Sequence, residues 1–317
     1  MTRSDSILRS LLLAVPVLAM TAALMIPLAP QAQAQRRVVQ GGNGPIKVLL
    51  ITKGHGYDRH NFFAMFDALG DQITWTHVEQ PAAQAFWDAD MAADYDVFVN
   101  FDAMGRTPMK RANGTTYFEK PSRAAQDGFR DLLRSGKGMV FFHHGISAWN
   151  QAWDEYSEVV GGACDWANPV TKRGVHHPFS GYQPGIQQHS SVTPEGKGHP
   201  ILEGLEDGLD IVDETYHCPY FEDSITPLLR TDFEAKAKNF QPAQRRDPTW
   251  NPAQASNLSA WYKSAENSPI VYIQHGHDNL AWSNEGFRKL MGNAIKWAAS
   301  EKAMKWAKDH PSEIFHD

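Results

Sequence analysis

Cysteine is scarce in this sequence, which has 317 residues and only two cysteines, Cys164 and Cys218. Disulfides can therefore supply at most one crosslink within the chain. An even cysteine count in an oxidising compartment permits that single bond. The sequence does not show whether the two residues meet, so their pairing stays open at this stage.

An excess of positive charge is also missing. The chain carries 30 lysines and arginines against 36 aspartates and glutamates, a formal net charge of −6. Proteins that bind nucleic acids typically present clustered basic residues to the phosphates, so we expect no nucleic acid partner. With 42% hydrophobic residues and 21% charged residues, the composition is that of a globular protein able to bury a substantial core.

Compact catalytic and metal-binding motifs are absent too. The sequence has no H-x-x-x-H or H-E-x-x-H spacing, so any metal site has to be assembled from separate loops. Ser147 lacks the G-x-S-x-G frame in which a nucleophilic serine is usually presented. These absences disfavour both a helix-borne zinc site and a serine hydrolase.

The first 34 residues have the organisation of a secretory signal peptide. Arg3 and Arg9 precede an apolar stretch over residues 11–28, and small residues at 32–34 offer a cleavage site. An uncleaved membrane anchor is the alternative, but two prolines interrupt the stretch, and no nearby cysteine could accept a lipid. We expect a periplasmic or secreted mature protein without stable membrane association. Cleavage removes two arginines and one aspartate, which leaves a net charge of −7.

After a polar, glycine-rich leader over residues 35–45, which we expect to be flexible, apolar strand patterns alternate with helical patterns. Short apolar runs predict strands, and apolar spacings of three and four residues predict helices over 62–69, 126–134 and 284–299. The predicted strands are residues 47–52, 73–78, 96–101, 138–142, 209–216, 226–231, 258–263 and 269–275. Alternating strands and helices are typical of an α/β fold with a mostly parallel central sheet covered by helices on both faces. We assign residues 46–300 to one such domain and residues 301–317 to a C-terminal extension.

Two stretches lack a regular pattern. Residues 161–208 are rich in Gly, Pro, His and Asn, and we expect long loops of a functional kind there. His176 and His177 in this stretch either cover a pocket or lie on the surface. Residues 236–254 are expected to form an exposed loop.

Histidines and carboxylates follow several predicted strands. In an open parallel sheet, ligands bind beyond the carboxyl ends of the strands, where such side chains converge. The residues at these ends are His55, Asp58 and His60 after the first strand, Asn100 and Asp102 at 96–101, His143 and His144 after 138–142, and His275, His277 and Asp278 near 269–275. A separate acidic pair, Asp213 and Glu214, stands beside Tyr216. A single core histidine is usually structural, but repetition at equivalent strand ends favours a site.

The order of several motifs resembles the ThuA-like (trehalose utilisation) family over residues 46–299. The motifs are HHGISAW, EVVGGACDW, GHPILEGL, DETY, PIVYIQHGHDNLAW and IKWA. The resemblance implies a flavodoxin-like α/β sandwich, as in class I glutamine amidotransferases, and a role in disaccharide or glycoside catabolism, often beside oxidoreductases that make 3-keto sugars. Amidotransferases carry a nucleophilic cysteine on a strand-to-helix turn, and the corresponding HHGIS turn has none, so we expect no glutaminase activity.

A histidine-rich acidic site suits a 3-keto-glycoside, because the keto group acidifies the hydrogen on C2 and a base can then start elimination of the group on C1. We expect catalytic roles for His143, His144, Glu214, His277 and Asp278. The expected substrate contacts are His55, His60, Trp149, Asp213, Tyr216 and Trp282. A divalent metal such as zinc is possible on His60, His143 and His277. The alternatives are a non-catalytic carbohydrate-binding or scaffold protein, and a metal-dependent hydrolase with another substrate. The oligomeric state stays open.

Overall fold

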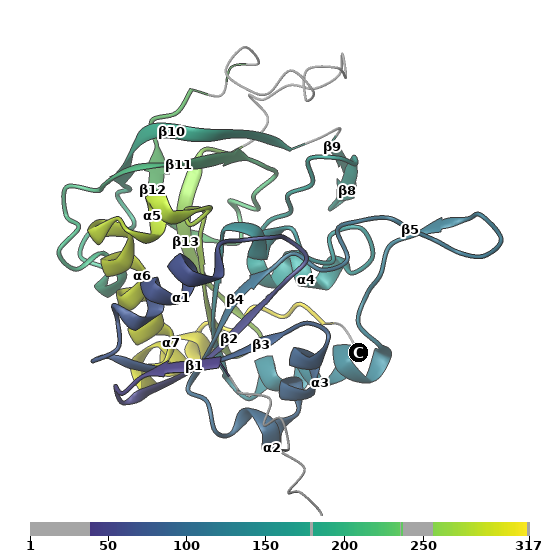
Figure 1. Ribbon diagram of the computed structural model, residues 1–317, viewed down its shortest axis with the longest axis horizontal. Helices are drawn as coiled ribbons and strands as arrows, with labels where there is room; N and C mark the ends of the chain where they lie inside the picture. The colour runs from purple at the N-terminus through teal and green to yellow at the C-terminus, as the bar shows by residue number, and fades with distance from the viewer. Residues whose placement is uncertain (1–38, 178–179, 235, 237–255, 316–317) are drawn as a thin grey trace, which may run out of the picture. The chain divides into compact units, whose positions relative to one another are not determined.

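A mixed sheet forms the centre of the structure, a computed structural model that describes residues 39–177, 180–234, 236 and 256–315 (Figure 1). Ten strands of the described residues hydrogen-bond in the order β1-β3-β2-β4-β7-β14-β13-β12-β10-β11. Their bounds are β1 Val39–Gly42, β2 Ile46–Lys53, β3 Ile73–Glu79, β4 Val97–Asp102, β7 Gly138–Phe142, β10 Gly181–Val192, β11 Leu209–His217, β12 Thr226–Thr231, β13 Leu258–Ala265 and β14 Ser268–Ile273.

The central strands are parallel, as the alternation of strands and helices predicts. β3, β2, β4, β7 and β14 pair in parallel, and the remaining pairs are antiparallel. This confirms the α/β fold with a parallel centre. β10 is a correction, because it lies in the stretch that was expected to be loops. Its sequence, GYQPGIQQHSSV, is too polar to signal a strand, and pairing to β11 and β12 holds it in the sheet.

The leader is a second correction. Residues 39–42, which were expected to be flexible, form β1 and pair antiparallel with β3. A Cβ at Gly41 would come within 2.7 Å of the Trp75 ring, so glycine lets the backbone approach the edge of the sheet. At the other end of the chain, α7 (Glu301–Asp309) buries Ala303 and Ala307 and contacts β13 and β14.

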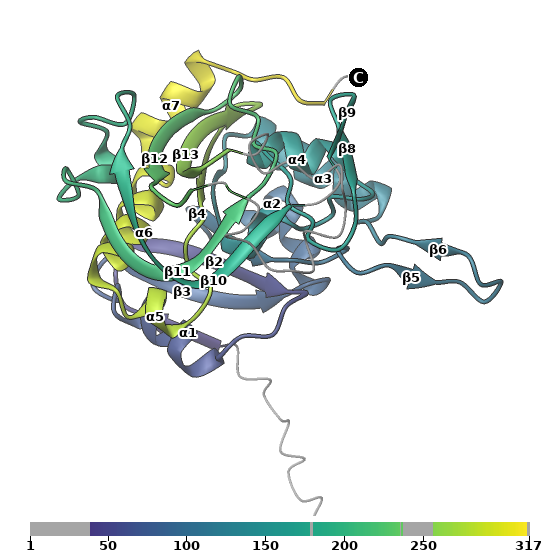
Figure 2. The same ribbon diagram turned by 90° about the horizontal axis from the view of Figure 1, so that it is seen from above.

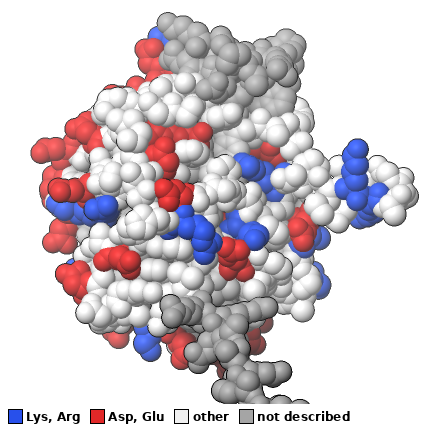
Figure 3. All heavy atoms as spheres, viewed as in Figure 1, with Lys and Arg blue, Asp and Glu red and all other residues white. Residues whose placement is uncertain are grey.

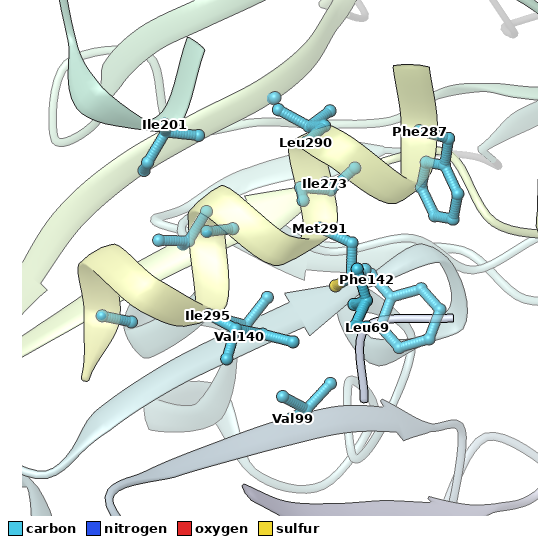
Figure 4. Packing of buried hydrophobic residues seen from close by; sticks show 14 of the residues in the cluster. Leu69, Val99, Val140, Phe142, Ile201, Ile273, Phe287, Leu290, Met291 and Ile295 are labelled. Atoms are coloured by element: carbon cyan, nitrogen blue, oxygen red, sulfur yellow. The ribbon is translucent and has the colours of Figure 1, made fainter. Parts of the chain in front are cut away.

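Helices cover both faces of the sheet (Figures 1 and 2). Val48 and Leu50 point to the face covered by α1 and α6, and Leu49 and Ile51 point to the face covered by α3 and α4. Figure 4 shows α6 packing on Val140 of β7. The bounds are α1 Arg59–Asp67, α2 Ala89–Ala92, α3 Arg123–Arg134, α4 Asp154–Val160, α5 Asn279–Trp282 and α6 Glu285–Ala298, with 3₁₀ turns at Ala82–Trp87, His143–Ile146 and Pro200–Leu202. The expected helices over 62–69, 126–134 and 284–299 correspond to α1, α3 and α6.

Two small hairpins stand apart from the main sheet. The first joins β5 (Met109–Lys110) to β6 (Thr116–Tyr117) and projects away from the body, as Figure 2 shows. The second joins β8 (Val170–Lys172) to β9 (Val175–His177), which contains His176 and His177. Within the described residues, no helix is long and apolar enough to cross a membrane. The loop expected at 236–254 lies outside the described residues except for Lys236.

Candidate functional site

The paired histidines lie in a buried 3₁₀ turn directly after the central strand β7. The turn sits tightly against β4, because a Cβ at Gly145 would come within 2.7 Å of the Asn100 carbonyl oxygen. Tyr272 Oη donates to the His143 carbonyl oxygen at 3.0 Å, and Tyr156 Oη donates to the Gly145 carbonyl oxygen at 3.0 Å. The strand therefore ends in two imidazoles because the turn directs them into a cluster of polar side chains.

The His143 ring is oriented by a backbone carbonyl. Its Nδ1 lies 2.8 Å from the Gln274 carbonyl oxygen, which can only accept, so Nδ1 carries a hydrogen. Its Nε2 faces the cluster, 2.6 Å from Tyr216 Oη, 2.9 Å from His277 Nδ1 and 3.3 Å from Glu214 Oε2. The Nε2 atom of His143 thus faces three polar neighbours, in the orientation typical of a metal ligand or a base.

The Glu214 carboxylate lies 3.1 Å from His277 Nδ1 beside this ring. Burial opposes the charge on Glu214, but the neighbouring His143 and His277 side chains outweigh this effect and hold the pKa of the carboxyl well below its usual range. Burial also opposes the charge on His277, and the hydrogen bond and charge of Glu214 reverse the effect and raise the His277 pKa. Glu214 is therefore a fixed negative charge in the cluster.

His144 and His55 are neutral imidazoles at the same place. Burial lowers the pKa of His144 well below its usual value, and neighbouring imidazoles and Arg106 add to this effect. Burial and then Arg106 lower the pKa of His55. The two rings contact each other with centroids 4.0 Å apart. His144 Nδ1 lies 3.1 Å from Tyr216 Oη, whereas His144 Nε2 and His55 Nδ1 are buried and have no hydrogen-bond partner among the described residues.

Asp213 supports the cluster through hydrogen bonds to the backbone. Its carboxylate accepts from the backbone nitrogens of Gly276 at 2.6 Å and His277 at 3.1 Å, and one oxygen lies 3.6 Å from His275 Nδ1. Asp213 is fully buried and does not line the cavity. Asp213 therefore holds the loop that carries His277 in place. It was expected to contact the substrate, but the structure makes it a positioning residue.

These side chains open onto a cavity of about 570 Å³. Such a volume is within the range of ordinary small-molecule sites. The cavity is lined by His55, Arg106, Thr107, Pro108, His144, Asp165, Trp166, Ala167, Tyr182, Glu214, Tyr216 and His277. Of the sequence-predicted site residues, His55, His144, Glu214, Tyr216 and His277 line it, and His143 contacts three of them from below.

Four sequence-predicted residues lie elsewhere. His60 is exposed on the first turn of α1, and Asp278 is exposed and caps α5 through the Leu280 nitrogen at 2.8 Å. Trp149 and Trp282 are 1% exposed and belong to the core. None of the four lines the cavity. His176 and His177 do not line it either.

Sequence reasoning missed Arg106, Asp165, Trp166 and Tyr182, which lie in irregular segments or in the unpredicted strand β10. A signal was present for the Trp166 loop, since Cys164 precedes it and Cys218 follows the Tyr216 strand. The structure shows a disulfide between these two cysteines, both fully buried. The bond ties the loop to β11, and neither sulfur is available as a nucleophile while it is intact.

Three imidazoles could hold a metal ion. One ring nitrogen from each of His143, His144 and His277 lies within 4.8 Å of the others, and the Glu214 carboxylate borders two of them. Histidine nitrogens and carboxylate oxygens are the usual ligands of zinc. His144 takes the place that His60 had in the expected ligand set, because α1 carries His60 away from the cluster.

The fold and this cluster define an α/β protein with parallel strands at the centre of its sheet, in which histidines and a carboxylate gather beyond the end of β7. The family model described as ThuA, trehalose utilisation, matches residues 47–298, and the chain belongs to this family. No curated protein matches the chain.

Two solved structures are similar to it in fold. A ThuA-like protein from Parabacteroides merdae has 18% identity and a TM-score of 0.55, with coverage of 81% of this chain and 90% of its own. One from Bacteroides uniformis has 17% identity and a TM-score of 0.52, with coverage of 82% and 94%. PurLQS from Thermotoga maritima also matches, with 11% identity, a TM-score of 0.44 and coverage of 80% and 99%.

Proposed function

We propose that this protein acts in carbohydrate catabolism by cleaving 3-keto-glycosides, and that its ligand is a small sugar. The convergence of three imidazoles and Glu214 on one cavity, with the His143 ring in contact with them, carries the proposal. The fold accounts for none of these groups by itself, because packing does not require several buried imidazoles to share polar neighbours. Family membership supports a carbohydrate-related role.

The proposed reaction needs no external oxidant. A base removes the proton on C2, the resulting enediolate expels the oxygen on C1, and that oxygen takes up a proton. Water then adds across the C1–C2 double bond, so the sum is a hydrolysis. We assign the base to His55, whose Nδ1 has no hydrogen-bond partner among the described residues and which lines the cavity. The imidazolium so formed can return its proton to the departing oxygen.

Other residues hold the site in place. We propose that His143, His144 and His277 hold a divalent metal ion, which when bound would polarise the keto oxygen. The Gln274 carbonyl fixes the His143 ring, and Glu214 fixes His277. Tyr216 keeps its hydroxyl hydrogen, because burial and nearby carboxylates raise its pKa well above the usual value, and it can donate to His144 Nδ1 at 3.1 Å.

The test combines metal analysis of the purified mature protein with turnover of a panel of native and 3-keto glycosides, before and after chelation. We expect stoichiometric metal and chelator-sensitive loss of the keto-glycoside. His143→Ala should lose the metal. His55→Gln should keep it and lose turnover by about 100-fold or more, the low end for removal of a general base.

His60→Gln is the matched control, since His60 lies five residues from His55 but is exposed on α1. It should change neither metal content nor turnover. Sugar binding without metal and without turnover would refute the catalytic proposal and favour a binding protein. Chelator-sensitive turnover of a non-sugar substrate alone would point to another metal-dependent hydrolase.

We also propose that the protein is exported, on the basis of residues 1–34, which lie outside the described residues. The buried disulfide supports this, because such bonds persist in oxidising compartments. Mass analysis of the protein from the periplasmic and culture fractions should give a chain that begins near residue 35. A full-length chain in the membrane fraction would contradict export by a cleaved signal.

A further inference from the structure

The cavity contains buried nitrogen atoms that the described residues leave without hydrogen-bond partners. Among the described residues that line it, the buried polar atoms without a partner are all nitrogens: His55 Nδ1, His144 Nε2 and Trp166 Nε1. Imidazole nitrogens can accept, donate or bind a metal, but an indole nitrogen can only donate. A buried donor without a partner is costly, so Trp166 favours a ligand that brings an acceptor.

The carboxylates of the cavity cannot serve as that acceptor, because both are already occupied. Asp165 accepts from the backbone nitrogens of Ala167 and Asn168, each at 2.9 Å, and from Gln151 Nε2 at 2.8 Å. Glu214 is paired with His277. The negative charges of the site are therefore used to hold the protein together.

Arg106, in contrast to these carboxylates, is a charged group of the cavity that has no partner of opposite charge among the described residues. Its guanidinium lies over the Trp166 ring at 5.3 Å, and within the described part of the chain it makes no ion pair or hydrogen bond. The contact with the ring keeps the guanidinium at the cavity, and its N–H donors are left for a bidentate partner. An arginine in a cavity, stacked but without an anion, indicates that the anion comes with the ligand.

The loop that carries Arg106 is held firmly at its start. Asp102 accepts from the Met104 backbone nitrogen at 2.8 Å, and the Trp149 backbone nitrogen donates to the Met104 carbonyl oxygen at 2.8 Å. Gly105 has φ +71°, and a Cβ there would come within 2.6 Å of the Trp149 ring. The core residue Trp149 thus supports the loop from below, and Arg106 is placed before any ligand arrives.

We propose that Arg106 and Trp166 form an anion subsite and that the substrate sugar carries a carboxylate, as in a hexuronide. This assignment narrows the substrate class of the proposed function, and it rests on that proposal for the statement that the ligand is a sugar. The subsite is separate from the metal-binding imidazoles, because guanidinium and indole nitrogens do not bind metal ions. A phosphorylated sugar presents the same acceptor chemistry and is distinguished by the test.

The test is calorimetric titration of the mature protein with methyl glucuronide, methyl glucoside and glucose 6-phosphate. A hydrogen-bonded charge pair contributes about 1.5–3 kcal/mol, so methyl glucuronide should bind about 10- to 100-fold more tightly than methyl glucoside. Arg106→Gln should abolish this preference. Arg111→Gln is the matched control, because Arg111 also stacks on an aromatic ring, that of Tyr117 at 4.6 Å, but on the projecting hairpin, where Figure 3 shows Lys and Arg side chains.

Equal affinity for the two methyl glycosides, no binding of either, or a preference that survives Arg106→Gln would overturn the proposal. Tighter binding of glucose 6-phosphate than of methyl glucuronide would overturn the carboxylate assignment and give the subsite to a phosphorylated sugar. The measurement is independent of turnover. A protein that binds the glucuronide through Arg106 but cleaves no keto-glycoside would therefore refute the proposed reaction and leave the subsite standing.

Discussion

Asp213→Asn should destabilise the protein and displace His277, because Asp213 is the buried support of the loop that carries this histidine. The carboxylate accepts from two backbone nitrogens, those of Gly276 at 2.6 Å and His277 at 3.1 Å. Asparagine keeps one oxygen and presents an amide donor where the second acceptor was. One charge-assisted hydrogen bond is lost and a buried donor is left unpaired, so we expect a loss of about 2–4 kcal/mol in the free energy of unfolding.

Asp210→Asn is the matched control on the same strand, β11. The Asp210 side chain is 78% exposed and pairs with His189 Nδ1 at 2.9 Å, whereas Asp213 is fully buried. An exposed pair contributes about 0–1 kcal/mol. Urea unfolding followed by tryptophan fluorescence measures both losses, provided that the slope with urea is unchanged.

Equal losses of unfolding free energy in the two variants would refute the reasoning, because it rests on burial and on the two backbone donors. A second readout separates positioning from stability. Under conditions where Asp213→Asn is still folded, its turnover should fall and its metal content should drop, while Asp210→Asn matches the wild type. Normal metal content in folded Asp213→Asn would show that this carboxylate does not position His277.

Three further predictions concern the support of the cavity and the protein's pH range. Replacing Cys164 and Cys218 by serine should lower the free energy of unfolding by about 4 kcal/mol, which is the chain-entropy value for a crosslink across 54 residues. It should also weaken sugar binding, because the Trp166 loop loosens. An unchanged melting temperature would contradict this prediction. Gly105→Ala should reduce the preference for methyl glucuronide over methyl glucoside. The backbone angle φ of +71° at Gly105 disfavours alanine, and the added Cβ would collide with the Trp149 ring, so the loop that carries Arg106 has to move. Calorimetry that finds the preference unchanged would show that the loop tolerates a side chain. Burial lowers the pKa of His77 and of His199 to about 4, from 6.5 in the unfolded chain. The unfolded chain therefore binds more protons between these values, and these two groups should make the melting temperature fall as the pH drops from 6.5 to 4. Replacing both histidines by glutamine should make that decline shallower, because other buried histidines such as His144 still contribute to it, and an equally steep decline would assign it to those other groups.

Part of the site could be predicted because strand ends are readable from local sequence. The apolar run at 138–142 stops at two imidazoles, and the carboxyl ends of parallel strands meet at one edge. This reasoning placed His55, His144 and His277 together correctly. It failed for His60 and Asp278, which also follow strands but begin helices, because a spacing of a few residues does not show which side chain turns back toward the sheet.

The sequence by itself determined the α/β class, the positions of the central strands and the three main helices, since these follow from apolar periodicity within short segments. It also determined that no cysteine lies on the turn after β7. Only the tertiary structure decided the rest: the Cys164–Cys218 bond, the Asp213 support, the proximity of His144 to His143 and His277, and the contact of Arg106 with the Trp166 ring. Each of these depends on contacts between segments far apart in the chain, and local patterns carry no information about which distant segments meet.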